Sequence, residues 1–255
     1  MLKIEEQLFK EFNLEERHVR KNQNKEIYYL NLSGQDLKEI PSIVNEIKSL
    51  TNLSLGCNNI SEIKNLDGLE NLETLSLNNN KIKKIELLKL PNLKFLYLSY
   101  NKITKIENLN LKRLETLFLN NNKIPKIENL DDLPCLKILG LARTSITKME
   151  NLESVSDLRE FYLSNNRISE IPPIKGLYEI RRLDLRHNNI EYIENLDFQK
   201  HLKELDIREN PIKDFGDDQF FLLSRLQRLW IDKAIYDKFH QVRYLNWSSG
   251  VEINH

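Results

Sequence analysis

One short pattern repeats along almost the whole sequence. Its clearest copy runs from Leu72 to Ile82, with leucine at the first, fourth and sixth positions, asparagine at the ninth and isoleucine at the eleventh. Units of this kind start every 21 to 24 residues, at Ile27, Leu50, Leu72, Leu93, Leu114, Leu136, Leu158, Ile180, Leu202 and, more weakly, Leu226. So regular a repeat predicts a solenoid, in which each unit packs against its neighbours only.

The first half of each unit predicts a short β-strand. In the segment 74–77 leucines alternate with polar residues, which is typical of a strand with one buried face. Strands at the same place in successive units would lie side by side and form a parallel sheet of about ten strands.

The ninth position predicts a ladder of buried amides. It is asparagine in seven units and is replaced by Gln35, Thr144 and Ala234 in the others. An asparagine side chain both donates and accepts hydrogen bonds, so it can satisfy the backbone of a buried turn. Threonine can replace only part of that bonding, and we expect the unit that contains Thr144 to be looser.

The second half of each unit has an apolar residue at every third position, as in Ile60, Ile63, Leu66 and Leu69. This spacing is too short for an α-helix and fits 3₁₀ turns or extended segments. The sequence therefore predicts an α/β fold, a right-handed horseshoe with a parallel sheet on its concave side, a thin convex side, and a cap at each end.

Residues 1–26 precede the first unit and predict the N-terminal cap. Ile4, Leu8 and Phe12 recur at the spacing of an amphipathic helix. A solenoid exposes apolar surface at its ends unless a cap covers it. The alternative for this segment is a disordered tail.

The array of repeats is expected to cover residues 27–212, and residues 213–255 are expected to form the C-terminal cap with the degenerate last repeat. Asp217 or Asp218 would begin a short helix. Further expectations are an apolar face made by Ile235, Phe239 and Val242, and a strand over residues 244–247 that pairs at the sheet edge.

The amino-acid composition narrows the classes of partner and the cellular compartment that we expect. The chain has 38 basic and 38 acidic residues, so its formal net charge of zero gives no overall attraction to nucleic acid or to an anionic membrane. The start of the chain lacks the layout of a secretion signal. Cys57 and Cys135 lie in distant units and are expected to be free thiols, which fits a reducing compartment. We expect a cytoplasmic location, or a nuclear one if the source is eukaryotic.

The sequence gives little support for an enzymatic function. The sequence contains neither an HExxH motif nor a GxSxG elbow, and its seven glycines form no phosphate-binding loop. His187 beside Asp184 and Asp206 could form an acid–base or metal cluster, but an open wall offers no pocket for it. The expectation is a protein without catalytic activity, cofactor or metal.

After the asparagine turn, several units continue with Ile-Glu-Asn-Leu, at residues 106–109, 127–130 and 193–196. This 22-residue unit resembles the leucine-rich repeats of the nuclear regulatory subunit of protein phosphatase-1, a subclass shared with internalins and a spliceosomal subunit. The resemblance implies a non-enzymatic binder whose concave face grips its partner with aromatic and acidic residues. Among the residues at the fifth position, those that match these types include Phe118, Tyr162, Asp184, Asp206 and Trp230.

Two groups of concave residues form the candidate binding site. The aromatic group contains Phe95, Tyr97, Tyr100, Phe118 and Tyr162. The mixed-charge group contains Arg182, Asp184, Arg186, His187, Glu204, Asp206, Arg208 and Glu209, with Trp230 beyond it. Exposed aromatic and arginine side chains are frequent hot spots of protein interfaces. Alternatively, the aromatic rings stack on one another and the charges pair between neighbouring units.

The function expected from these residues is non-enzymatic binding of a partner protein on the concave face by a monomer. Small molecules, nucleic acids and membranes are not expected partners. Two alternatives stay open: a regulatory subunit of the phosphatase-1 type, and a nucleic-acid-associated subunit of a ribonucleoprotein.

Overall fold

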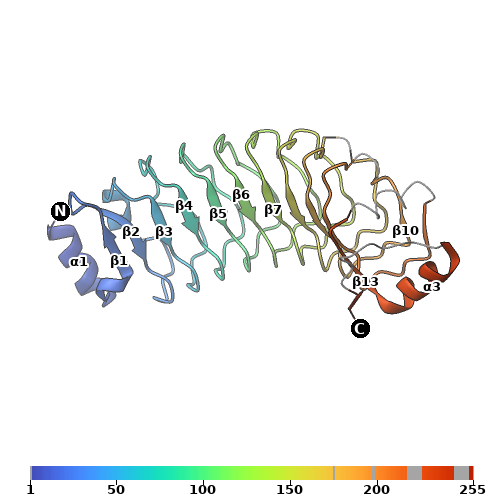
Figure 1. Ribbon diagram of the computed structural model, residues 1–255. Helices are drawn as coiled ribbons and strands as arrows, with labels where there is room; N and C mark the ends of the chain where they lie inside the picture. The colour runs from blue at the N-terminus through green and yellow to red at the C-terminus, as the bar shows by residue number, and fades with distance from the viewer. Residues whose placement is uncertain (1, 175, 197–198, 217–225, 244–252, 255) are drawn as a thin grey trace.

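The protein is an elongated solenoid with a helix at each end (Figure 1). The computed structural model describes residues 2–174, 176–196, 199–216, 226–243 and 253–254. Helix α1 (Leu2–Phe12) lies at the N-terminal end and helix α3 (Lys233–Arg243) at the C-terminal end. Between them the chain winds through the repeats, and each turn of the solenoid adds one strand to a single long sheet.

Each repeat contributes one short strand, and neighbouring strands are parallel and in register. The ten repeat strands are β2 (Ile27–Asn31), β3 (Asn52–Ser54), β4 (Thr74–Ser76), β5 (Phe95–Tyr97), β6 (Thr116–Phe118), β7 (Ile138–Gly140), β8 (Glu160–Tyr162), β9 (Arg182–Asp184), β11 (Glu204–Asp206) and β13 (Arg228–Asp232). This arrangement confirms the predicted parallel sheet. The central residue of each three-residue strand is buried, and its neighbours face the concave side.

Two further strands complete the sheet as it is described. Strand β1 (Val19–Lys21) pairs antiparallel with β2 at one edge, and β14 (Ile253–Asn254) pairs parallel with β13 at the other. The described sheet therefore has twelve strands, two more than the repeats supply. The strand predicted over residues 244–247 lies outside the described residues.

The convex side is thin, as the spacing of apolar residues predicted. Its described secondary structure consists of the 3₁₀ helix η2 (Ser42–Glu46) and the two short paired strands β10 (Tyr192–Ile193) and β12 (Asp214–Phe215). Leucines and isoleucines from both halves of every unit meet in one continuous core that runs the length of the solenoid. This core makes the concave sheet a stiff support for the side chains on its outer surface.

The predicted asparagine ladder is present inside the solenoid. Its seven members are at most 9% exposed: Asn58, Asn80, Asn101, Asn122, Asn166, Asn188 and Asn210. Asn80 shows the pattern, since its Nδ2 donates to the carbonyl oxygens of Leu77 at 3.1 Å and of Leu55 in the preceding unit at 2.9 Å, and its Oδ1 accepts from the N–H of Ile60 at 2.9 Å. Each asparagine therefore joins its own turn to the turn before it.

Thr144 interrupts this ladder in the sixth unit. Its hydroxyl donates to the carbonyl oxygen of Leu141 at 2.7 Å, and its N–H donates to Oδ1 of Asn166 at 3.1 Å. A hydroxyl has one proton to donate, so it cannot also bond the preceding unit as an amide does. Thr144 is nevertheless fully buried. That this unit is looser stays a prediction.

A second asparagine ladder runs along the convex side, and the sequence analysis did not foresee it. In five units the sixteenth residue is an asparagine with φ between 57 and 61°: Asn65, Asn108, Asn129, Asn151 and Asn195. Each donates its Nδ2 to a carbonyl oxygen of the preceding unit at 2.7 or 2.8 Å. Asparagine is one of the few residues that adopt left-handed backbone readily, so it both shapes this turn and fastens it.

Helix α1 covers the N-terminal end of the core. Leu8 and Phe12 of the helix are buried, as are Leu14 and Val19 after it. The helix expected from the apolar spacing is present, while the exact cap boundaries, 1–26 and 213–255, stay predictions. At the other end Ile235 of α3 packs against the core, whereas the helix expected after Asp217 or Asp218 and the contacts of Phe239 and Val242 fall outside the described structure.

Cys57 and Cys135 are both free and exposed, as expected from their distance in the sequence. In the part of the chain that the structure describes, no helix combines the length and apolar character needed to cross a bilayer.

Candidate functional site

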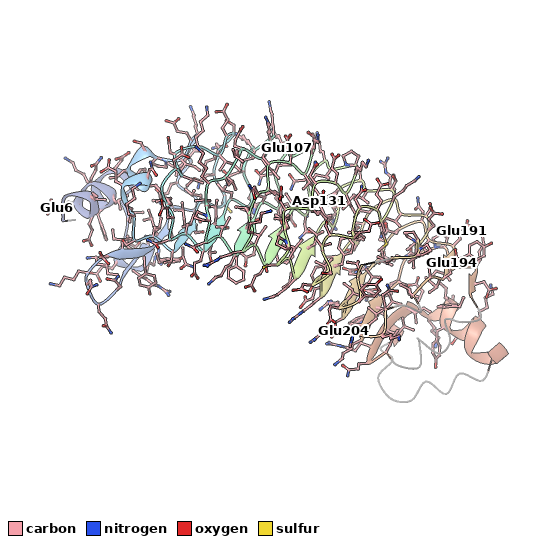
Figure 2. The ribbon with its side chains drawn as sticks, turned by 90° about the horizontal axis from the view of Figure 1, so that it is seen from above. Glu6, Glu107, Asp131, Glu191, Glu194 and Glu204 are labelled. Carbon is pink, nitrogen blue, oxygen red and sulfur yellow. The ribbon has the colours of Figure 1, made fainter. Side chains whose placement is uncertain are left out.

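The predicted site residues lie on the outer face of the sheet and on the turns that follow its strands. Figure 2 shows Glu204 on the strand side of the solenoid, whereas Glu107 lies on the opposite, loop side. Residues at the third and fifth positions of each unit point out of the sheet on either side of a buried leucine, because side chains alternate along a strand. In-register pairing then places the same positions of successive units in rows across the sheet.

The fifth positions build a row of aromatic rings. The rings of Tyr97 and Phe118 are stacked, with centroids 5.8 Å apart and planes at 14°. Phe118 also contacts Tyr162, two strands further on, with centroids 6.2 Å apart and planes at 37°. All three side chains are half-buried, so each ring keeps part of its surface open.

Gly140 allows this row to cross strand β7. A Cβ atom at residue 140 would lie 2.2 Å from Cδ1 of Phe118 and 2.9 Å from Oδ1 of Asn120. Heavy atoms that are not bonded to each other do not approach so closely, so the absence of a side chain is what lets the Phe118 ring lean over β7 toward Tyr162. The glycine thus continues the aromatic row rather than interrupting it.

The row continues as alternating cations and rings. The guanidinium carbon of Arg182 lies 5.3 Å from the ring centroid of Tyr162 and 5.7 Å from that of Trp230, and the guanidinium carbon of Arg228 lies 5.5 Å from that of Trp230. Glu204 holds both arginines in place, with an oxygen 3.5 Å from Arg182 and an ion pair to Arg228. The contacts between the arginines and the rings are attractive because the face of an aromatic ring carries partial negative charge. We call Tyr97, Phe118, Tyr162, Arg182, Trp230 and Arg228 the concave row.

Phe95 and Tyr100 flank this row. Phe95 is half-buried at the third position of its unit, where strand β5 begins. Tyr100 is the eighth residue of its unit, stands in the turn after β5 at φ 58° and is 54% exposed. His187 and Glu209 are the eighth residues of two consecutive later units and have the same left-handed backbone, at φ 53° and 56°. This eighth position therefore directs polar and aromatic side chains along one rim of the concave face.

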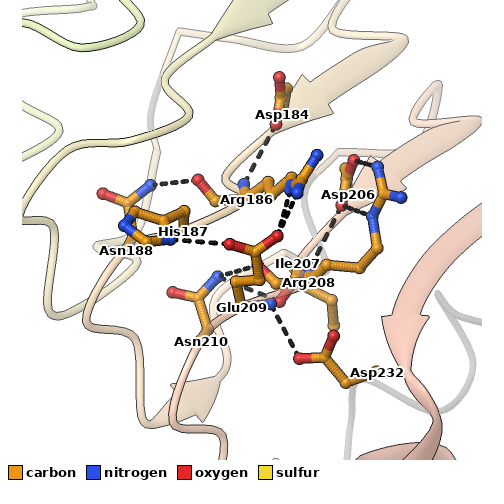
Figure 3. A network of polar contacts seen from close by, with 10 residues as sticks. All are labelled: Asp184, Arg186, His187, Asn188, Asp206, Ile207, Arg208, Glu209, Asn210 and Asp232. Carbon is orange, nitrogen blue, oxygen red and sulfur yellow. Dashed lines mark hydrogen bonds and ion pairs between the residues drawn. The ribbon is translucent and has the colours of Figure 1, made fainter. Parts of the chain in front are cut away.

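The charged residues form a self-paired network in the eighth and ninth units (Figure 3). Glu209 accepts from Arg186 and lies 2.8 Å from Nδ1 of His187, and these bonds lower the pKa of Glu209, with the Arg186 bond as the main cause. Asp206 is bound by Arg208 through two nitrogens at 2.9 and 2.5 Å. Asp184 accepts the N–H of Arg186 at 3.1 Å, which ends strand β9.

Tyr162 is held by a neighbouring acid. Its hydroxyl donates to the carboxylate of Glu160, two residues earlier on β8. Burial, followed by this bond, raises the pKa of Tyr162 to about 12. The phenol is therefore neutral at physiological pH and fixed in one orientation within the concave row.

Both structural alternatives considered for these residues are observed: the rings stack across strands, and the charges pair with one another. All twelve predicted residues lie along the concave face or its rim. The sequence analysis missed Glu160, Arg228 and Asp232, which bond to Tyr162, Glu204 and the N–H of Glu209. The signal for Arg228 was available, since it follows Arg182 and Glu204 at the third position of successive units.

The imagined cluster of His187 with Asp184 and Asp206 is not assembled, because Nδ1 of His187 contacts Glu209 instead. Within the described residues, no group of three or more histidine, cysteine or acidic side chains is placed to hold a metal ion.

The charged Asp184 carboxylate lowers the stability of the fold, which a neutral side chain at this position would not do. Burial raises its pKa, and the neighbouring carboxylate of Asp206 adds to this effect. An acid with a raised pKa in the folded state contributes stability below its unfolded pKa and loses it as the pH rises through the folded pKa. The charged Asp184 carboxylate is thus kept at some expense of stability at neutral pH.

We therefore expect Asp184→Asn to stabilise the protein at pH 7, by less than about 1 kcal/mol. The amide oxygen keeps the bond from the N–H of Arg186 and removes the buried charge. This advantage should disappear below pH 3.8, the ordinary pKa of the group, because both states of the wild type are then protonated. Urea unfolding of both proteins at several pH values measures the difference, and an advantage that does not change with pH would contradict this assignment.

Comparisons with known proteins agree with the fold. The family described as leucine rich repeats (2 copies) matches residues 70–111 and 156–198, and a single leucine rich repeat matches 198–216. Dynein axonemal light chain 1 of Chlamydomonas reinhardtii is 42% identical over 52 residues, a match that covers 20% of this chain and 26% of that protein.

Solved structures extend the likeness to most of the chain. A leucine-rich-repeat protein of Leptospira interrogans superimposes with a TM-score of 0.79 at 24% identity, over 89% of this chain and 60% of that one. Internalin C2 of Listeria monocytogenes gives a TM-score of 0.62 at 26% identity, over 68% of this chain and 76% of that one. These matches do not confirm the resemblance to the phosphatase-1 regulatory subunit. The repeats found in the sequence, the strands they form and these likenesses together identify the chain as a leucine-rich-repeat protein.

Proposed function

We propose that the concave face binds a partner protein, with the concave row as its centre. The repeat architecture supports a role as a protein-interaction module in general. The observation that favours this face is the continuous row from Tyr97 to Arg228, in which half-buried rings contact one another and the guanidinium groups of Arg182 and Arg228. Aromatic and arginine side chains dominate the binding energy of most interfaces.

The geometry of the row favours tight binding for a second reason. Its side chains are already ordered by their mutual stacking and by Glu160 and Glu204, so little conformational freedom is lost when a partner docks. The mixed-charge network beside it offers hydrogen-bonding groups at a fixed spacing and would select the correct partner rather than add much affinity. Catalysis has no part in this proposal.

A phosphatase-1-type regulator is a narrower version of the same proposal, because it too would use concave aromatic and acidic residues. A ribonucleoprotein subunit is less well supported, since acidic residues are interposed between the basic residues of the concave face. We place the protein in the cytoplasm as a monomer, which agrees with its two exposed free thiols and the local match to a dynein light chain.

The test is a double substitution, Tyr97→Ala with Phe118→Ala, followed by affinity purification and mass spectrometry. Loss of two stacked rings should weaken binding of the partner at least about thirtyfold, the effect of a single hot spot. Tyr178→Ala and Tyr192→Ala, at positions 54% and 50% exposed and outside the concave row, serve as matched controls. The melting temperature of the double variant should match that of the wild type, so that any loss of binding is not due to unfolding. A partner protein that the double variant and the wild type recover equally would refute the proposal for that partner.

A further inference from the structure

The convex asparagine ladder has a gap at Leu87. Leu87 is the sixteenth residue of the unit that starts at Leu72, the position that asparagine occupies in five other units. A leucine side chain cannot donate to the carbonyl oxygen of Ile63, as Asn65 and Asn108 donate to the equivalent oxygens of Ile40 and Ile85. Nor does Leu87 share their left-handed φ. Leucine at this position therefore removes a hydrogen bond between neighbouring turns of the solenoid.

Burial of the leucine side chain compensates for little of this loss. The Leu87 side chain is 59% exposed, so it contributes little to the core. Between Asn65 and Asn195 the ladder has one other gap, and it has a plain structural reason, because Pro173 follows Pro172 and the two rings set the backbone of that turn themselves. An apolar side chain that replaces a structural amide and remains in solvent points to a role in contacts with another molecule.

Surface hollows surround Leu87. Three of them, of about 570, 460 and 520 Å³, include Leu87 in their lining. The third is the most apolar and is also lined by Leu88, Leu90 and Pro91. The units that start at Leu72 and Leu93 are 21 residues long, one or more residues shorter than the other units. We call these hollows and Leu87 itself the Leu87 surface.

The Leu87 surface is acidic. Its lining contains seven carboxylates and three lysines. One of the lysines, Lys64, is paired with Glu62, while Lys112 from outside the lining pairs with Asp132. Asp67, Glu70 and Asp131 have no ion pair with any described residue. A chain whose formal net charge is zero therefore concentrates negative charge around one exposed leucine.

We propose that the Leu87 surface binds a basic amphipathic segment of a partner protein. The apolar side chains of this segment would contact Leu87 and fill the hollow lined by Leu88, Leu90 and Pro91, and its lysines or arginines would face Asp67, Glu70 and Asp131. Charge complementarity selects this occupant over an acidic or neutral segment. The surface lies on the convex side, so the inference does not depend on binding at the concave row.

A designed peptide pair tests the proposal directly. The probe is a fluorescent helix-forming peptide of leucine and lysine, about 14 residues or four turns long, with one apolar face. A second peptide has glutamate in place of every lysine. Fluorescence anisotropy at low and moderate salt should show saturable binding of the lysine peptide that weakens with salt, and at least about tenfold weaker binding of the glutamate peptide.

Substitutions in the 255-residue chain then locate the site. Leu87→Asn restores the residue of the neighbouring units and should weaken binding of the lysine peptide by about tenfold while leaving the melting temperature unchanged or higher. Asp67→Asn with Asp131→Asn should weaken it and flatten its salt dependence. Tyr178→Asn, which changes a similarly exposed side chain elsewhere, should leave peptide binding unchanged, as should the Tyr97→Ala, Phe118→Ala pair.

Binding that is equal in the wild type and Leu87→Asn overturns the proposal, as does the absence of saturable binding by the lysine peptide. Peptide binding that is lost in the Tyr97→Ala, Phe118→Ala variant but kept in Leu87→Asn would assign the peptide to the concave row and contradict the convex site.

Discussion

Replacing Asn101 by alanine should destabilise the protein by about 3 kcal/mol. Asn101 is 9% exposed, its Nδ2 donates to the carbonyl oxygens of Leu77 at 2.9 Å and Leu98 at 3.0 Å, and its Oδ1 accepts from the N–H of Ile82 at 3.0 Å. Alanine leaves these buried backbone groups without their partner, and each stranded group costs about 1–3 kcal/mol unless water reaches it. Urea unfolding followed by circular dichroism measures the loss.

Asn110→Ala is the matched control, since Asn110 is exposed on the convex side nearby. Its free energy of unfolding should stay within about 0.5 kcal/mol of the wild type. If Asn101→Ala were as stable as this control, the buried ladder would not hold neighbouring turns together.

The second large effect is expected for Phe161→Ala. Phe161 is fully buried on β8, between Glu160 and Tyr162, at a position where every other repeat strand has leucine. Removing a buried phenylalanine costs about 3–5 kcal/mol, from lost burial and from the cavity left behind. The cavity would lie beneath strand β8, which carries Tyr162, so the concave row should lose order at its centre.

A solenoid distributes such damage unevenly, because each turn contacts only its neighbours. We expect Phe161→Ala to broaden the urea transition as the turns on either side of β8 become less coupled. Phe161→Leu, which installs the residue of the other units, should be much less harmful. A free energy of unfolding within about 1 kcal/mol of the wild type for Phe161→Ala would show that the core near β8 can close around the gap.

Much of the fold could be read from the sequence because each unit repeats the same physical requirement. The alternation around Leu75 predicts a strand, Asn80 predicts a buried turn, and the copies predict that strands and turns stack in rows. Spacing also predicted a convex side without long helices. These features depend on contacts between neighbouring units. Neighbouring units are close in the sequence, so a short stretch of sequence is enough to predict the contacts.

Features that depend on pairs of distant side chains were not predictable in the same way. The sequence placed Phe118 and Tyr162 on the same face, but their contact depends on how the Phe118 ring leans across Gly140. The pairing of one glutamate, Glu204, with two arginines required the register of three strands. The convex ladder was missed although its asparagines recur visibly, because an exposed loop asparagine has many ordinary explanations.

The most direct test of the central proposal is hydroxyl-radical footprinting of the protein, free and in complex with the partner recovered by affinity purification. We predict that Tyr97, Tyr100 and Phe118 become less reactive in the complex, while Tyr178 and Tyr192 on the outer surface keep their reactivity. Unchanged reactivity of Tyr97 and Phe118 in a saturated complex would contradict the assignment of the concave row as the binding surface.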